Sequence, residues 1–131
     1  MRNQTLTRSE MLVMDILWQM PDGGCVADIL TRYPEPRPAY TTVATFLKIL
    51  ENKGFVAYRR GRGKLHLYYA LMSREEYRRR VMADVKDTFF GGSATSMLDF
   101  FVREERLSAD DIRELLAIVQ AQDVNPDERN A

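Results

Sequence analysis

The spacing of the apolar residues changes at Gly54, and this change constrains the fold more than any other feature of the sequence. Before Gly54, apolar residues recur at the spacing of a helix, with one face apolar and the other polar. After Gly54, they alternate with polar residues, as in strands. The segment Arg60-Gly61-Arg62-Gly63 divides the alternating stretch in two and predicts a hairpin turn. The pattern therefore indicates several helices followed by one hairpin, as in a winged helix-turn-helix.

Three helices are expected before this hairpin. Thr7 and Glu10 fit a capping box, which opens the first helix. A second, shorter helix follows and ends before three closely spaced prolines, which cannot continue it. The third helix should run from about Tyr40 to Lys53, closed by Gly54 in the left-handed conformation.

The third helix has one apolar face and one polar face. Helical spacing gathers Val43, Phe46, Leu47 and Leu50 in one stripe, which we expect to be buried. The opposite face, with the residues that flank it, consists of Thr41, Thr42, Ala44, Thr45, Lys48 and Asn52. Short polar side chains of this kind fit the major groove of DNA, where they can meet base edges and thymine methyl groups. Thr42, near the start of the helix, is placed to bind a phosphate.

The hairpin and the charge distribution support the same interpretation. We expect Arg59, Arg60, Arg62 and Lys64 to lie along the flanking phosphate backbone. The formal net charge is zero, but residues 1–72 carry 10 Lys and Arg against 6 Asp and Glu, and residues 73–131 carry 9 against 13. Double-stranded DNA, whose phosphates carry negative charge, is therefore the expected partner of the first half of the chain.

Composition argues against an enzyme and against a cofactor. Cys25 and His66 are the single cysteine and histidine, too few for a disulfide or a zinc site. Cys25 is expected to be a structural thiol, and His66 an exposed strand residue. No nucleophile–base pair or phosphate-binding loop is visible, so we expect no catalytic residues, no metal and no cofactor.

We expect a cytoplasmic protein that does not insert into a membrane. The sequence lacks an uncharged apolar run of about eighteen residues, the length that a membrane span requires. Its first residues also lack the apolar stretch of a secretory signal.

The second half of the chain should be helical. A capping box at Ser73 opens a fourth helix that runs to about Phe89, and two short helices are expected near Ala94–Glu104 and Ser108–Gln120. Isolated helices of this length are marginal in water, so their apolar faces must be buried. The residues expected to form a homodimer interface are Met97, Leu98, Phe101, Val102, Ile112, Leu115, Leu116 and Val119. The alternative is that both helices fold back onto the head of the same chain.

These elements predict a mainly α fold with a small β-hairpin. A winged helix-turn-helix DNA-binding head should occupy residues 5–72, a helical dimerisation region residues 73–120, and a disordered tail residues 121–131.

Residues along most of the chain also resemble one family. They are Leu6-Thr7, Glu10, Met14, Leu17-Trp18, Thr41-Thr42-Val43-Ala44-Thr45, Leu47, Leu50, Lys53-Gly54, Tyr68-Tyr69, Ser73, Glu75-Glu76-Tyr77 and Leu107-Ser108. With these residues the chain resembles the BlaI/MecI family of penicillinase repressors over nearly all of residues 5–120. The resemblance implies a winged-helix transcriptional repressor that dimerises through its C-terminal helices and binds a palindromic operator. It also implies inactivation by proteolysis, triggered by a membrane zinc metalloprotease sensor.

Two positions depart from the family pattern. The family's cut falls at an Asn-Phe bond in the fifth helix, and Phe100-Phe101 stands in its place here. Cleavage at this bond is therefore a hypothesis, and the alternative is that both rings belong to the dimer core. At Ala44 some relatives carry a longer basic side chain that reads a base. A methyl group leaves that discrimination to Thr41, Thr45 and Lys48.

The alternative function for such a fold is protein binding. A winged helix can also serve as a protein–protein interaction module without sequence-specific DNA binding. Residues 37–64 carry seven Lys and Arg against one acidic residue, Glu51. A protein-binding face would more often be apolar or mixed, so the charge favours DNA.

Overall fold

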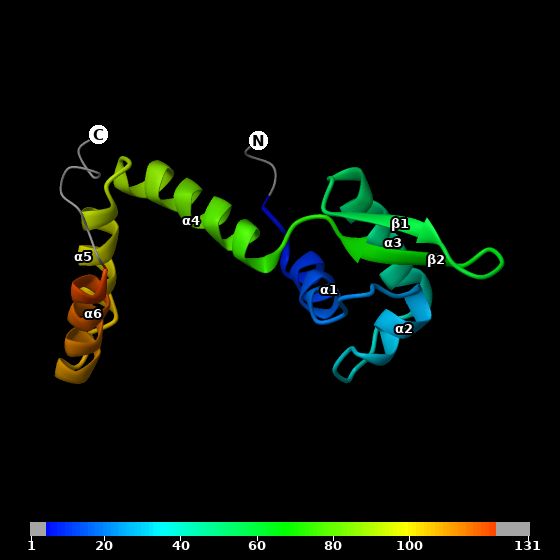
Figure 1. Cartoon of the computed structure of the whole chain (residues 1–131), viewed down its shortest axis with the longest axis horizontal. Coiled ribbons are helices and arrows are strands. Elements are labelled where there is room, and N and C mark those ends of the chain that lie inside the picture. The colour runs from blue at the N-terminus through cyan, green and yellow to red at the C-terminus, as the bar shows by residue number, and fades with distance from the viewer. Residues whose placement is uncertain (1–4, 123–131) are drawn as a thin grey trace. The chain divides into compact units, whose positions relative to one another are not determined.

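The structure, a computed structural model, describes residues 5–122. Six helices and two strands follow one another within these residues (Figure 1): α1 Arg8–Trp18, α2 Val26–Thr31, α3 Tyr40–Asn52, β1 Val56–Arg60, β2 His66–Ala70, α4 Arg74–Phe90, α5 Ala94–Glu104 and α6 Ala109–Ala121. The chain divides into two compact units, one ending at Asp84 and the other beginning at Val85. This order confirms the predicted fold class, a mainly helical chain with a winged helix-turn-helix pattern.

The predicted caps fix both ends of the helical part of the head. The Thr7 hydroxyl accepts the N–H of Glu10 at 3.2 Å, and the Glu10 carboxylate accepts the N–H of Thr7 at 2.9 Å. This reciprocal pair starts α1 by satisfying backbone donors that lack a partner within the helix. At the other end, Gly54 has a φ of 85°, which an L side chain rarely adopts, and it ends α3 as expected.

The loop between α1 and α2 adds a short bridge to the hairpin. The backbone of Gly24 exchanges two hydrogen bonds with Tyr68 of β2, at 2.9 and 2.8 Å. Gly23, with a φ of 74°, lies so close to β2 that a Cβ there would collide with the Tyr68 carbonyl oxygen. Glycine at this position therefore allows the loop and the strand to pair.

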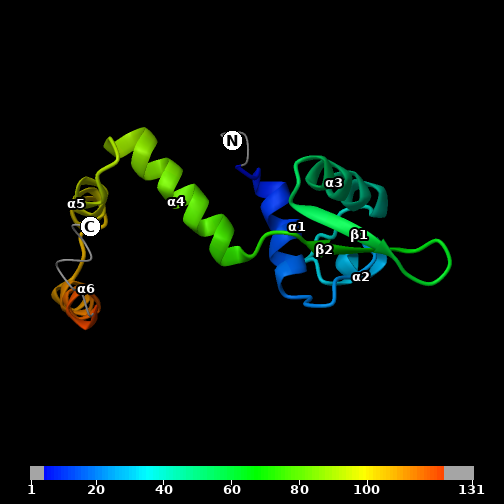
Figure 2. The ribbon, with the colours of Figure 1, turned by 45° about the horizontal axis from the view of Figure 1, so that its top comes forward.

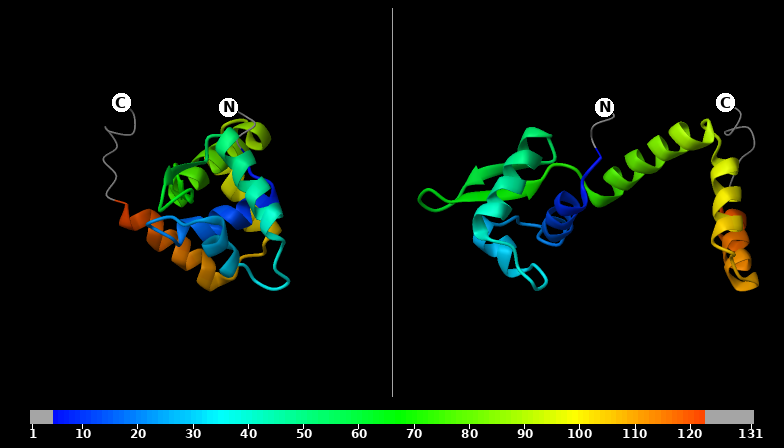
Figure 3. Two further views of the ribbon diagram at one scale, coloured as in Figure 1. Left: turned by 90° about the vertical axis from the view of Figure 1, so that its right-hand side faces the viewer. Right: turned by 180° about the vertical axis from the view of Figure 1, so that it is seen from behind.

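The hairpin is antiparallel and packs on the helices through one of its faces. Val56 pairs with Ala70, Tyr58 with Tyr68, and Arg60 with His66, so these residues share one face. Val56 and Tyr68 on that face are buried. Figure 2 shows the two strands beside α1 and α3, and the turn between them extends beyond the helices (Figure 3).

One core joins the three helices, the hairpin and the start of α4. Its largest fully buried side chains are Val13, Met14, Ile29, Val43, Leu47, Leu50, Phe55 and Val56. Val43, Leu47 and Leu50 belong to the apolar stripe that the sequence predicts on α3, and Phe55 and Val56 are the first residues after Gly54. Phe46 of the predicted α3 stripe is only partly buried and packs at the edge of this core.

The first turns of α4 belong to the head, so the first unit extends beyond residue 72, where the sequence-based boundary lay. Tyr77 is 8% exposed, and its ring packs against those of Phe55 and Trp18, with centroids 5.8 and 6.1 Å apart. Its hydroxyl accepts the buried N–H of Leu6 at 2.8 Å. The Trp18 indole also donates to the Met72 carbonyl at 2.8 Å. Aromatic packing thus places this part of α4 within the head.

The second unit contains the end of α4 and the helices α5 and α6. Ser93 caps α5 by accepting the N–H of Ser96 at 3.0 Å. Ser108 and Asp111 form a reciprocal capping box at the start of α6. No residue of α5 or α6 is buried. Residues 123–131 of the expected tail lie outside the described residues.

Candidate nucleic-acid interface

The outward face of α3 is polar and open, as its spacing predicts. Thr41, Thr45, Lys48 and Asn52 are all exposed, because Val43, Leu47 and Leu50 bury the opposite side of the helix. The Thr45 hydroxyl donates to the Thr41 carbonyl at 2.9 Å. This bond fixes the Thr45 rotamer, so that its methyl group and the oxygen lone pairs remain available to another molecule.

The two residues that flank this face differ from one another. Thr42 is exposed in the first turn of α3, and its N–H donates to the Ala39 carbonyl at 3.1 Å. Ala44 is half-buried and packs against the core. Of the six α3 residues expected at the interface, Ala44 is therefore the least accessible.

An ion pair between α1 and α3 fixes the end of α3 on the head. The Lys53 ammonium lies 2.9 and 3.0 Å from the two carboxylate oxygens of Glu10, and Glu10 is only 4% exposed. Burial alone raises the pKa of this carboxyl. The N–H of Thr7 and the charge of Lys53 outweigh that effect and hold the pKa below its usual value. Lys53 is therefore a positioning residue for α3.

The four basic residues expected on the hairpin fall into two groups. The Arg59 guanidinium donates to the Asp22 carbonyl at 2.9 Å and lies over the Tyr69 ring, 5.7 Å from its centroid. Arg60 points to the other face of the hairpin, while Arg62 and Lys64 lie in the exposed turn. Within residues 5–122, no ion pair involves Arg60, Arg62 or Lys64. All four side chains are exposed, but only the Arg59 guanidinium is engaged by the backbone carbonyl of Asp22.

The hairpin also carries aromatic residues that the sequence analysis did not assign to the interface. Tyr58 and His66 are exposed and stack with 3.9 Å between ring centroids. Tyr68 packs against Tyr58 at 5.6 Å. The signal that could have found them is the pairing across the predicted turn, because a short hairpin brings these positions to one face.

Comparison with known proteins agrees with this geometry. The chain matches the model of the penicillinase repressor family over residues 6–121. The chain belongs to the penicillinase repressor family. No curated protein matches it. The repressor is accordingly a DNA-binding transcriptional regulator and not an enzyme.

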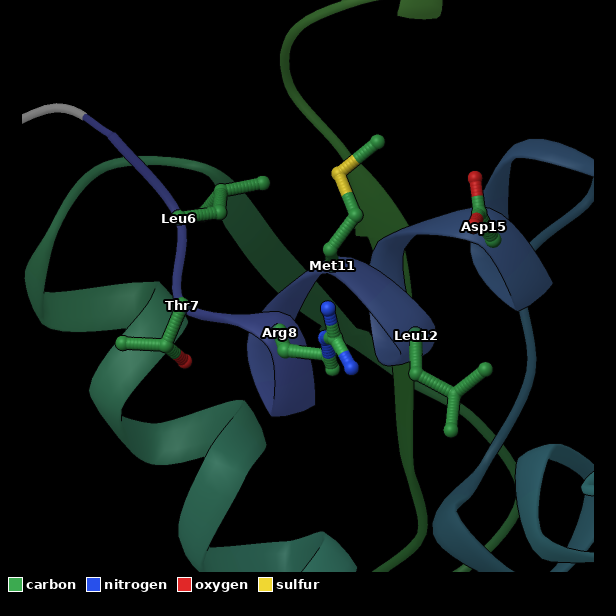
Figure 4. Close-up of a pocket in the computed structure, with 6 residues that line it drawn as sticks. All are labelled: Leu6, Thr7, Arg8, Met11, Leu12 and Asp15. Carbon is green, nitrogen blue, oxygen red and sulfur yellow. The ribbon is translucent and has the colours of Figure 1, made fainter.

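A groove lies along α1 of the repressor. Figure 4 shows the side chains that line it, which are Leu6, Thr7, Arg8, Met11, Leu12 and Asp15. Thr7 is engaged in the helix cap, and Asp15 pairs with Arg74 at 3.2 Å. Cys25 is half-buried at the start of α2. Within the part of the chain that the structure describes, no three His, Cys, Asp or Glu side chains gather where they could hold a metal ion.

The second unit of the repressor exposes many apolar side chains. Among the eight residues expected to form the dimer interface, Met97, Val102 and Leu115 are half-buried, and the other five are exposed. Phe89, Phe100 and Ile118 add to this set with exposed fractions of 74, 46 and 55%. Neither Phe89 nor Ile118 was predicted there: Phe89 precedes the two helices of the expected interface, and Ile118 lies beside the apolar stripe of α6.

None of the helices in residues 5–122 combines the length and the apolar character that a membrane span requires.

Proposed function

We propose that the repressor acts as a homodimer, with the outward face of α3 in each head reading one half of a palindromic operator. The observation that carries this proposal is the exposed face formed by Thr41, Thr45, Lys48 and Asn52. A helix enters the major groove only if its outer side chains are short or can reach base edges, and these four meet that requirement.

Phosphate contacts from the hairpin fix the position of each head. Arg60, Arg62 and Lys64 are exposed and carry no intramolecular ion pair within residues 5–122, so their charge is available to the DNA backbone. Thr42 adds a neutral contact at the start of α3. Contacts of this kind orient a head without reading sequence, which leaves discrimination to α3.

The apolar surface of the second unit supports the pairing of two copies. A single winged head buries too little surface against DNA for high specificity. Two heads on one duplex double the contact surface and increase the specificity. The exposed apolar residues of α5 and α6, such as Phe101, Leu116 and Val119, exceed what a soluble monomer usually leaves open to water. A two-fold partner would cover them with the same surface of its own chain.

We assign Phe100 and Phe101 to this dimer interface. Phe100 packs on both Phe90 and Phe101, with centroids 5.5 Å apart in each pair. Their bond lies in the interior of α5, whereas proteases prefer exposed and locally unfolded segments. Cleavage of this bond under the control of a membrane zinc metalloprotease sensor is the alternative. The test is to co-express the repressor with the sensor that is encoded nearest to its gene, and to add the inducer of that sensor. An intact chain supports our assignment of both rings to the dimer interface. Fragments that end at Phe100 overturn it.

Exchange of one α3 residue tests the function directly. An operator is first selected from a pool of random duplexes by the full chain. Lys48→Ala should weaken binding to that operator by about 1–3 kcal/mol and leave binding to a scrambled duplex much less affected. Lys86→Ala, the same change on α4, is the control and should alter neither affinity. Equal losses on both duplexes would show that α3 does not read sequence.

A further inference from the structure

Three aromatic rings form a row along one face of the hairpin. Tyr58 of β1 lies opposite Tyr68 of β2, and His66 is the next residue of β2 on the same face, towards the turn. The His66 imidazole stacks on the Tyr58 ring, with 3.9 Å between centroids and 13° between planes. This parallel stack covers one face of the imidazole and leaves its edge, which carries both nitrogens, to the side. The row therefore holds an exposed imidazole in one orientation.

The row lies on the hairpin face that packs on the head. Tyr68 is buried within the core, next to α3. Burial, and then the charge of Glu51 in α3, raises the pKa of the Tyr68 hydroxyl. Arg59 points the other way, towards the Asp22 carbonyl. Tyr58 and His66 continue the row from Tyr68 towards the hairpin turn.

We propose that His66 binds a backbone phosphate of the operator as an imidazolium, so that the repressor takes up a proton when it binds DNA. This inference rests on the proposed interface. An imidazolium donates from both ring nitrogens, and a charge-assisted hydrogen bond to phosphate is stronger than a neutral one. The face of the Tyr58 ring also attracts a cation stacked on it.

Cationic and aromatic side chains surround His66. Arg60 is the cross-strand partner of His66, and Lys64 precedes it by two residues in the turn. Tyr58 and Tyr68 flank the His66 ring. From α3, Glu51 and Tyr40 interact electrostatically with the Tyr68 hydroxyl. An anionic phosphate bound at the imidazole edge favours the protonated form of a histidine.

A single histidine isolates the expected effect of pH. His66 is the only histidine in the sequence, and histidine is the side chain that ordinarily titrates between about pH 5 and pH 8. Lysine and arginine keep their charge throughout that range. The pKa of Glu10 is lowered from a usual value of 4.5, so this carboxylate stays ionised as well.

The experiment measures affinity for the selected operator, and for a scrambled duplex, between about pH 8 and pH 5 at constant salt. We expect the wild-type affinity to rise by about threefold to fivefold per head as the pH falls. His66→Gln should abolish the rise, and His66→Arg should bind tightly with no rise. Arg62→Ala, the matched control, should bind more weakly at every pH and keep the rise. Calorimetry in two buffers of different ionisation enthalpy should show proton uptake by the wild type and none by His66→Gln.

The outcomes separate this inference from the proposed function. If the wild type prefers its operator but shows no rise, or if His66→Gln keeps the rise, the role of His66 is overturned and the α3 interface stands. If the wild type binds every duplex alike at each pH, the proposed function itself fails.

Discussion

The Lys53 ammonium contacts both carboxylate oxygens of Glu10, at 2.9 and 3.0 Å, and so joins the end of α3 to the first turn of α1. Because Glu10 is buried, removing its partner leaves a charge with little access to water. Lys53→Met should lower the free energy of unfolding by about 2 kcal/mol, measured by urea denaturation. The double variant Glu10→Gln with Lys53→Met should recover part of this loss, since it removes the unpaired charge. If the double variant is less stable than Lys53→Met, the unpaired Glu10 carboxylate does not destabilise the folded protein.

The same carboxylate predicts how stability depends on pH. The folded-state pKa of Glu10 lies below its usual value of 4.5, so the unfolded chain binds this proton more readily than the folded one. Its contribution to stability is therefore present above about pH 4.5 and is lost as the pH falls through the folded-state pKa. Urea denaturation of Glu10→Gln should show a smaller loss of stability than wild type over that acidic range. Parallel curves for the two proteins would contradict the assignment.

Local rules predicted the helices well, because each depends on residues close in sequence. The capping box at Thr7 and the left-handed Gly54 were both found where the pattern placed them. The Glu10–Lys53 pair was missed, since its members lie 43 positions apart and each had a sufficient local explanation. The place of Tyr77 in the head was missed for the same reason: its partners, Leu6 and Phe55, are distant in sequence.

The hairpin shows why site residues were harder to predict than elements. Composition alone treats Arg59 and Arg60 as equivalent cations, but strand alternation sends them to opposite faces. Likewise, the leucines of the second alternating stretch suggest a regular apolar face. In the structure Tyr68 is buried, while Leu65 and Leu71 are exposed. Which face packs inward depends on contacts with helices that are distant in sequence, and no local pattern encodes those contacts.

The different surroundings of Arg59 and Arg62 predict different effects on how DNA affinity depends on salt concentration. Arg62→Ala should weaken binding to operator and scrambled duplex alike, and lower the slope of log affinity against log salt by about one per head. Arg59→Ala removes the bond to the Asp22 carbonyl instead. It should lower the melting temperature and leave the slope unchanged. Should Arg59→Ala flatten the slope as Arg62→Ala does, its guanidinium must leave Asp22 and bind DNA.

The second unit gives a prediction about assembly. Leu116 is 52% exposed, so Leu116→Asp should be tolerated by the folded monomer and should disrupt a two-fold interface. Sedimentation velocity should show monomers for this variant and dimers for wild type. Ala117→Asp changes an exposed residue on the other side of α6 and serves as the control, which should remain dimeric. Dimers of Leu116→Asp would mean that another surface joins the two copies.

Selection of duplexes by the full chain from a random pool tests most directly whether paired α3 helices read DNA. The account predicts enrichment of an inverted repeat, with half-sites separated by about ten base pairs or a multiple of that spacing, because two-fold heads meet successive major grooves on one side of the duplex. Lys48→Ala should lose or relax preference within each half-site. A pool that shows no enriched sequence at low salt would contradict the account.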